Sequence, residues 1–345
     1  MPSDDDQVQD QNAERQIVVG VDGSEHSRMA LKWASDEAKR HGSALRIVHS
    51  QISDHENVPN WYEPGSSASS PGQAVVDDAF GLVATRHPSV MAHAEVVEWP
   101  PSLVLTIASR SADLLVVGAR GKGGFEELRL GSVSDQCIQY AHCPVAVVHV
   151  DPDLTPLRAV QPRIIVGIDG SLGSTRALRW ALEEARIRSA SVRAVYAWQY
   201  PPIGTFVLGP RQGFKTAARE IIDAATEYAQ KWAPDVPTEV VDCFEATVPA
   251  LLDASEGAEL LVTGSRGHGG FSDALLGSVA HQCARHAKCA VIIARPHIVE
   301  GHTEGAKKVV RMNRSVERST GIERPADSPA STRADPGARR GFDLG

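Results

Sequence analysis

One glycine pattern occurs twice in this 345-residue chain, with the same spacing in both places. Gly118-Ala-Arg-Gly121 is followed by nine residues and then by Gly131-Ser132, and Gly264-Ser-Arg-Gly267 is followed in the same way by Gly277-Ser278. Each copy comes directly after an apolar run that predicts a buried strand. Glycine lets backbone N–H groups converge on a phosphate, and a helix that begins at the Gly-Ser pair would favour anions at its N-terminus. The pattern therefore predicts two phosphate cradles of a nucleotide site.

The rest of the sequence is duplicated in register with these motifs. The stretch VVGVDGS at residues 18–24 returns as IVGIDGS at residues 165–171. Cys137 and Cys143 return 146 residues later as Cys283 and Cys289. We infer two copies of one domain.

Composition excludes several classes of function. A formal net charge of −8 argues against nucleic acid as the main partner. The Cys-x5-Cys spacing fits neither a redox pair nor a usual zinc site, so we interpret the cysteines as small buried hydrophobes. No apolar segment approaches ~18 residues, and the acidic first ten residues do not resemble a secretory signal. We expect a cytoplasmic protein that binds neither membrane nor nucleic acid.

The order of apolar segments predicts two α/β domains in tandem. Strands alternating with helices are typical of a doubly wound parallel sheet, here of five strands per domain with helices on both faces. In such sheets ligands bind at the carboxyl ends of the strands, where the strand order reverses. The expected segments are a disordered acidic leader (1–14), domain 1 (15–150), a linker (151–162), domain 2 (163–297) and a disordered tail (298–345).

On these motifs the chain resembles the universal stress protein family in its tandem-domain, ATP-binding form. Both copies match the family signature Gly-x2-Gly-x9-Gly-Ser/Thr, and the resemblance covers about residues 15–150 and 163–296. It implies a Rossmann-like fold of the adenine nucleotide alpha hydrolase type and one ATP site per domain, with or without Mg²⁺.

The resemblance also implies roles for particular residues. In the family, an aspartate after the first strand contacts the adenosine, and a glycine two residues earlier lets the ligand approach that strand. The glycine turn wraps the ribose and phosphates. The Gly-Ser-Val at the following helix start binds phosphate oxygens. In domain 1 the implied set is Gly20, Asp22, Gly118, Ala119, Arg120, Gly121, Lys122, Gly123, Gly124, Gly131, Ser132 and Val133. In domain 2 it is Gly167, Asp169, Gly264, Ser265, Arg266, Gly267, His268, Gly269, Gly270, Gly277, Ser278 and Val279.

Simpler interpretations stay open for some of these residues. Asp22 and Asp169 could merely cap the helices that follow, although the nearby serines are equally able caps. The loop cations could neutralise phosphate or simply be solvated. Where the family often places an apolar residue against adenine, this chain has the small residues Ser50 and Ala197.

The duplicated residues favour a nucleotide-dependent regulator of a stress or growth response. Neither copy offers a Ser-His-Asp or Cys-His arrangement, and no Walker GK[ST] sequence is present, so we expect no catalytic residues and at most weak ATPase activity. His142, His281 and His286 do not have the pattern of a chelating cluster, and no metal site is expected. The alternatives are a slow ATP- or AMP-using hydrolase and a nucleotide-free dimerising scaffold.

The apolar last strand of each copy predicts how the domains assemble. An unpaired hydrophobic edge strand invites aggregation, and a symmetric partner covers it. We therefore expect the two domains to pair face to face about a pseudo-twofold axis within the chain. Further assembly into a homodimer of tandem chains stays open.

Overall fold

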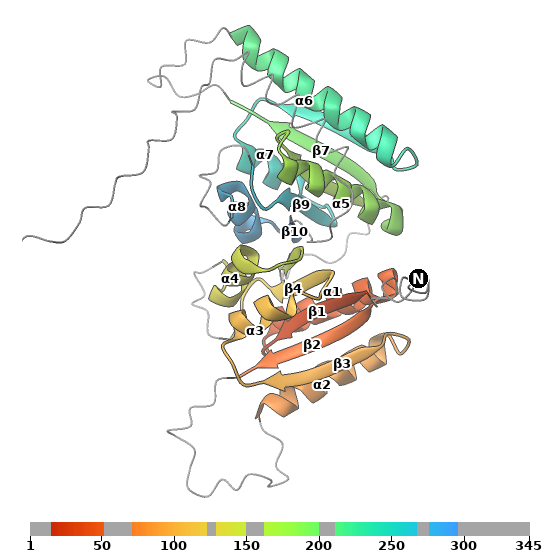
Figure 1. Cartoon of the computed structure of the whole chain (residues 1–345), viewed down its shortest axis with the longest axis vertical. Helices are drawn as coiled ribbons and strands as arrows, with labels where there is room; N and C mark the ends of the chain where they lie inside the picture. The colour runs from red at the N-terminus through yellow and green to blue at the C-terminus, as the bar shows by residue number, and fades with distance from the viewer. Residues whose placement is uncertain are drawn as a thin grey trace, which may run out of the picture.

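The computed structural model describes residues 15–51, 71–122, 129–149, 162–199, 211–267 and 276–295. The leader, the linker and the tail expected from the sequence lie outside these residues, apart from Pro162 at the end of the linker. The described residues confirm the predicted α/β class, with strands and helices alternating through both copies (Figure 1). None of their helices combines the length and the apolar character needed to span a membrane.

Each copy forms a five-stranded parallel sheet. Domain 1 contains β1 (Gln16–Val21), α1 (Glu25–His41), β2 (Ala44–Ser50), α2 (Pro71–Arg86), β3 (Ala92–Val97), α3 (Pro101–Ala108), β4 (Leu114–Gly118), α4 (Ser132–Tyr140) and β5 (Val145–Val148). Domain 2 contains β6 (Arg163–Ile168), α5 (Leu172–Arg188), β7 (Ser191–Ala197), α6 (Arg211–Trp232), β8 (Thr238–Cys243), α7 (Thr247–Ala254), β9 (Leu260–Gly264), α8 (Ser278–His286) and β10 (Ala290–Ala294). The strand order reverses between β1 and β4, and between β6 and β9, as a doubly wound fold requires.

Local chemistry sets the bounds of the first helix. The Ser24 side chain accepts a hydrogen bond from the backbone N–H of Ser27 and so caps the N-terminus of α1. Gly42 ends the helix with φ of 63°, a left-handed conformation that glycine adopts without strain. Between the caps Ala30, Leu31, Ala34 and Ala38 are buried at helical spacing, so one face of α1 covers the sheet.

Helices cover both faces of the sheet. One buried cluster joins residues of α1, α2, α5 and α6 to one face, and a second joins α3, α4, α7 and α8 to the other. Each cluster runs through both domains, so the two copies share a continuous core. The interpretation of the four duplicated cysteines as buried hydrophobes is confirmed. Cys137, Cys143, Cys283 and Cys289 are buried free thiols. Burial raises the pKa of Cys137 to about 12, which keeps its thiol protonated.

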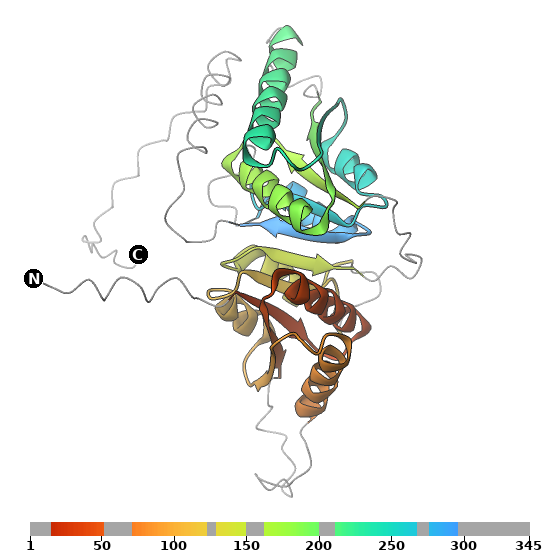
Figure 2. The ribbon, with the colours of Figure 1, turned by 90° about the vertical axis from the view of Figure 1, so that its right-hand side faces the viewer.

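The two domains meet edge to edge. β5 pairs with β10 in antiparallel fashion, with Val147 opposite Val291, Ala146 opposite Ile292 and Val145 opposite Ile293. The result is one ten-stranded sheet in which these two strands lie side by side at the centre (Figure 2). Pairing of the apolar last strands is confirmed, whereas a face-to-face arrangement is wrong. The edge contact satisfies the backbone N–H and C=O groups of both strands, which face-to-face packing would leave unpaired.

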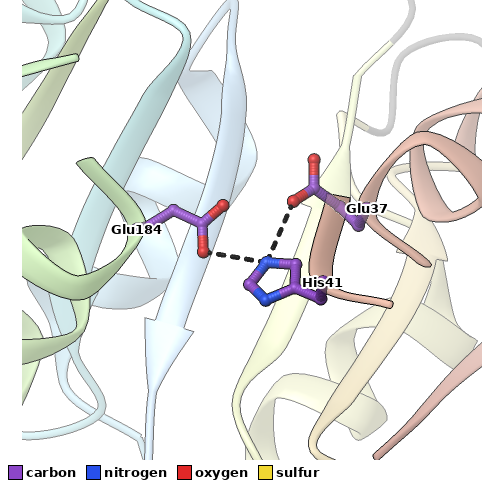
Figure 3. Close-up of side chains that lie close together, drawn as sticks. All are labelled: Glu37, His41 and Glu184. Atoms are coloured by element: carbon purple, nitrogen blue, oxygen red, sulfur yellow. Dashed lines mark ion pairs between the residues drawn. The ribbon is translucent and has the colours of Figure 1, made fainter. Parts of the chain in front are cut away.

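A cluster of buried charged side chains lies in the domain interface, beside the paired strands β5 and β10. α1 contributes Glu37 and His41, and α5 contributes Glu184 and Arg188 (Figure 3 shows the first three). The Arg188 guanidinium lies 2.7 Å from Glu37 Oε1 through Nη2 and 2.7 Å from Glu184 Oε1 through Nε. His41 Nε2 lies 3.1 Å from Glu184 Oε2 and 3.5 Å from Glu37 Oε2. Each carboxylate therefore contacts cations from both domains.

This cluster also brings two carboxylates and an imidazole within 4.8 Å of one another, a group that could hold a metal ion. Arg188 argues against that use, because its guanidinium already bonds to both carboxylates. With His41 protonated, two positive charges balance two negative ones. We therefore interpret the cluster as an interdomain ion network rather than a metal site.

Stability should fall at alkaline pH as His41 loses its proton. Hydrogen bonds to Glu184 and Glu37 raise the pKa of His41 to about 9, from 6.5 for an unperturbed histidine. A raised folded-state pKa means that this stabilisation is fully present below pH 6.5 and is lost as the pH rises through about 9. The loss should be on the order of 3 kcal/mol between pH 6 and pH 10.

Urea unfolding of the wild type and of His41→Gln at both pH values measures this difference. Arg40 and Glu259 also contact the cluster. His41→Arg is the matched control, because arginine occupies the equivalent position in domain 2 and does not titrate in this window. An equal pH dependence in the wild type and in His41→Gln would contradict the assignment.

Candidate nucleotide-binding site

The sequence-predicted residues of each domain gather at the carboxyl ends of two neighbouring strands. β1 pairs with β4, and β6 pairs with β9, on either side of the reversal in strand order. Asp22 follows β1 directly, and the glycine motif begins at the last residue of β4. The structure therefore brings the two segments together at the position where doubly wound sheets bind ligands.

The Asp22 carboxylate joins these two segments. Its Oδ1 accepts a hydrogen bond from the backbone N–H of Ser24 at 2.9 Å, and its Oδ2 accepts one from the backbone N–H of Lys122 at 2.8 Å. Burial alone would raise the pKa of Asp22, but the hydrogen bonds from Ser24, Lys122 and Ser27 outweigh it and hold the pKa below its usual value. Asp22 is therefore an ionised residue that fixes the geometry of the loop. Because Ser24 caps α1, the interpretation of Asp22 as a mere helix cap is not supported.

The structure gives a different reason for Gly121 than the one expected from the sequence. A Cβ atom at this position would lie 2.5 Å from Asp22 Oδ2, and one at Gly267 would lie closer still to Asp169 Oδ2. Neither glycine has positive φ, so backbone conformation is not what requires glycine at these positions. Both residues are glycine in this structure because the aspartate carboxylate packs against the backbone of the motif.

The other motif glycines also pack against the protein. A Cβ atom at Gly118 would lie 2.7 Å from the His26 carbonyl group, and one at Gly264 would lie 2.6 Å from the backbone of Gly173. The first turns of α1 and α5 therefore rest on the ends of β4 and β9. A Cβ at Gly20 would lie 2.8 Å from Leu105 Cδ1 on α3. Gly167 lies in the same way against Leu251 on α7. The space beside these two glycines is thus taken by a leucine rather than kept for a ligand.

The helix that follows each motif begins at a glycine. Gly131 and Gly277 are the N-caps of α4 and α8, and they have no side chain that could accept a hydrogen bond from the first turn. Each is held in place through its own N–H, which donates to the carbonyl of Ala119 at 2.7 Å or of Ser265 at 2.8 Å. Ser132 and Ser278 are exposed, and Val133 and Val279 are half-buried. These helix starts contrast with α1 and α5, which serine side chains cap.

The cations of the two copies differ in their surroundings. In domain 1, Arg120 Nε donates to His26 Nε2 at 3.1 Å. Burial, and then the positive charge of Arg120, lower the pKa of His26 and favour the neutral imidazole that accepts this bond. In domain 2 the place of His26 is taken by Gly173, which packs against the carbonyl of Arg266. Gly123, Gly124, His268, Gly269 and Gly270 lie outside the described residues.

Sequence reasoning missed several neighbours of the site. The Ser134 hydroxyl donates to the Gly118 carbonyl at 2.6 Å, and the corresponding residue of domain 2 is Ala280, so the duplication gave no signal for it. At the second strand, the Ser50 hydroxyl donates to the carbonyl of Trp99. Beyond Ala197, the ring of Trp198 makes an edge contact with Phe244, with centroids 5.0 Å apart. A tryptophan directly after the strand was the available signal for this aromatic pair.

Comparisons with known proteins agree with the duplicated architecture. The profile of the universal stress protein family matches residues 14–149 and 162–295. Universal stress protein Rv2623 of Mycobacterium tuberculosis is 31% identical over 295 residues, which are 82% of this chain and 97% of the relative. Universal stress protein Rv2005c of the same organism is 33% identical over 290 residues, 81% of this chain and 96% of the relative.

A solved structure shows the same fold. The crystal structure of a universal stress protein from Archaeoglobus fulgidus has a TM-score of 0.53 and 18% identity, and covers 81% of this chain and 98% of its own. Two family matches in tandem, together with relatives that align along nearly their whole length, account for both domains. The chain belongs to the universal stress protein family.

Proposed function

We propose that this protein binds ATP at one site in each domain and acts as a nucleotide-dependent regulator of a stress or growth response. The observation that carries the proposal is the Asp22 carboxylate, which ties the loop after β1 to the glycine motif after β4. Asp169 accepts the equivalent bond from Ser171 N at 2.9 Å and lies as closely against Gly267. The same carboxylate arrangement therefore occurs in both domains at the reversal in strand order, which supports one ligand site in each.

The charges and dipoles around each site suit a nucleotide. The glycine N-caps of α4 and α8 have no side chain to accept hydrogen bonds from the first-turn N–H groups. These N–H groups and the helix dipole together favour a phosphate group at each helix N-terminus. Ser132, Val133, Ser278 and Val279 would supply these donors. Asp22 and Asp169 are the acceptors available to hydroxyl or amino groups of an adenosine. Any Mg²⁺ would be bound by the phosphates of the nucleotide and would reach the site together with it.

A regulatory role fits the distribution of the residues better than catalysis does. The duplicated groups are binding groups: glycines, an aspartate and helix starts. His26 is the candidate base next to the domain 1 motif, but it is bonded to Arg120 and its counterpart in domain 2 is Gly173. α1 begins beside the site and ends at Glu37 and His41 in the domain interface, and α5 repeats this course to Glu184 and Arg188. A rigid helix therefore leads from each site to the interface, which supports coupling between occupancy and conformation.

The first experiment counts and identifies the nucleotide. Protein purified without added nucleotide is denatured, and the released small molecules are identified by mass spectrometry; the stripped protein is then titrated with ATP by calorimetry. We expect two ATP molecules per chain and slow turnover, if any. Multiple-turnover hydrolysis would favour the rival hydrolase of ATP or AMP. Neither retained nor titratable nucleotide would favour a nucleotide-free scaffold and would contradict the proposal.

A further inference from the structure

Domain 1 has a groove between α1 and α2 that meets the proposed nucleotide site at Lys122 and extends away from it. Its volume is about 780 Å³, and it extends from Val21 and Gly23 along α2 as far as Arg86. Leu31, Val75, Ala79 and Leu82 line it with apolar side chains. The lining residues of α2 run from Ala74 to Arg86, which corresponds to ~18 Å of helix. The groove therefore follows α2 for about three turns and has a strip of apolar side chains in its lining.

Aromatic side chains occupy two of the equivalent helix positions in domain 2. α2 and α6 end at Arg86 and Trp232, 146 residues apart, so Leu82 corresponds to Tyr228. The rings of Tyr228 and Trp232 stack with centroids 6.2 Å apart. The guanidinium of Arg179, which corresponds to Lys32, lies 4.3 Å from the centroid of the Trp232 ring. The fold thus accepts stacked rings at positions where domain 1 has Leu82 and Arg86.

The groove carries excess positive charge. Arg28, Lys32 and Lys122 line it, and none of the three forms an ion pair with any residue that the structure describes. Arg86 is neutralised by Asp36, with bonds of 2.8 and 2.9 Å. The acidic lining residue is Asp78, which leaves a formal excess of about two positive charges along an apolar channel. Such a combination complements a molecule with an anionic head and an apolar chain.

We propose that the groove between α1 and α2 binds a single-chain amphipathic anion of the fatty-acid class. The acyl chain lies along Leu31, Val75, Ala79 and Leu82, and the carboxylate lies against Arg28 and Lys32. Burial of the methylene groups supplies the affinity, and the positive charges of Arg28 and Lys32 supply the preference for an anion. This site shares Lys122 with the proposed ATP site of domain 1, but the residues that hold the acyl chain and the carboxylate are not part of that site.

The test titrates the nucleotide-free, full-length protein with dodecanoate, and with dodecanol as the uncharged probe of equal chain length. We expect one saturable dodecanoate site per chain, with dodecanol bound at least tenfold more weakly. Arg28→Gln with Lys32→Gln should reduce dodecanoate affinity about tenfold or more and leave dodecanol binding unchanged. Arg179→Gln removes a cation from the equivalent helix of domain 2 and is the matched control, with no expected effect on either probe.

A second variant closes the groove with residues that the fold already accepts. Lys32→Arg, Leu82→Tyr and Arg86→Trp together copy Arg179, Tyr228 and Trp232 into domain 1. This triple variant should lose dodecanoate binding while retaining its circular dichroism spectrum and ATP stoichiometry. Unsaturable binding by the wild type, equal affinity for dodecanol, or unchanged binding by the folded triple variant would each overturn the proposal.

Discussion

Replacing Arg188 with alanine should destabilise the folded protein by about 3–5 kcal/mol, because it leaves buried carboxylates without their partner. The Arg188 side chain is 5% exposed and bonds to Glu37 and Glu184, which are 1% and 3% exposed. His41, together with the half-exposed Arg40 beside Glu37, would then have to compensate the two buried negative charges. The loss should appear as a lower urea midpoint, measured by circular dichroism at pH 7.

Arg186→Ala is the matched control on the same helix. Arg186 pairs with Asp235 through two hydrogen bonds, and both partners are exposed, unlike Arg188 and the buried glutamates. Surface ion pairs of this kind contribute little, so the control variant should unfold near the wild-type midpoint. Similar midpoints for the Arg188 and Arg186 variants would show that the interface network does not stabilise the fold.

The fold was predictable because its signals are local. Strands such as Leu114–Gly118 are continuous apolar runs, and α1 has a serine cap, a helical apolar face and a glycine end within 19 residues. The duplication then supplied the domain count. The edge-to-edge contact was only half predictable: apolar sequences at β5 and β10 indicate that the strands are covered, but they do not say by which part of the partner.

The residues of the site were predictable from the sequence, but the contacts among them were not. Asp22 contacts the motif across 100 residues of sequence, and no local pattern shows that its carboxylate is what requires glycine at position 121. The interface network was missed because Glu37 and Glu184 have the appearance of ordinary solvated residues of amphipathic helices. Their burial depends on the antiparallel pairing of β5 with β10, which brings the ends of α1 and α5 together.

Gly121→Glu should remove ATP binding from domain 1 and leave domain 2 functional. The new side chain would start 2.5 Å from Asp22 Oδ2, so the loop must move and the bond to the Lys122 N–H must break. The added carboxylate also repels both Asp22 and the phosphates. Losing two or three backbone-to-phosphate hydrogen bonds, at roughly 1.5–3 kcal/mol each, should weaken the site by about a hundredfold or more.

Calorimetric stoichiometry distinguishes the two sites. We expect about two ATP per chain for the wild type, one for Gly121→Glu or Gly267→Glu, and none for the double variant. Gly81→Glu is the matched control, because a Cβ there meets open space and domain 2 carries Glu227 at the equivalent helix position. It adds the same charge to the same domain and should leave both sites intact. A double variant that keeps the wild-type circular dichroism spectrum and still binds ATP normally would show that the glycine motifs do not form the nucleotide sites.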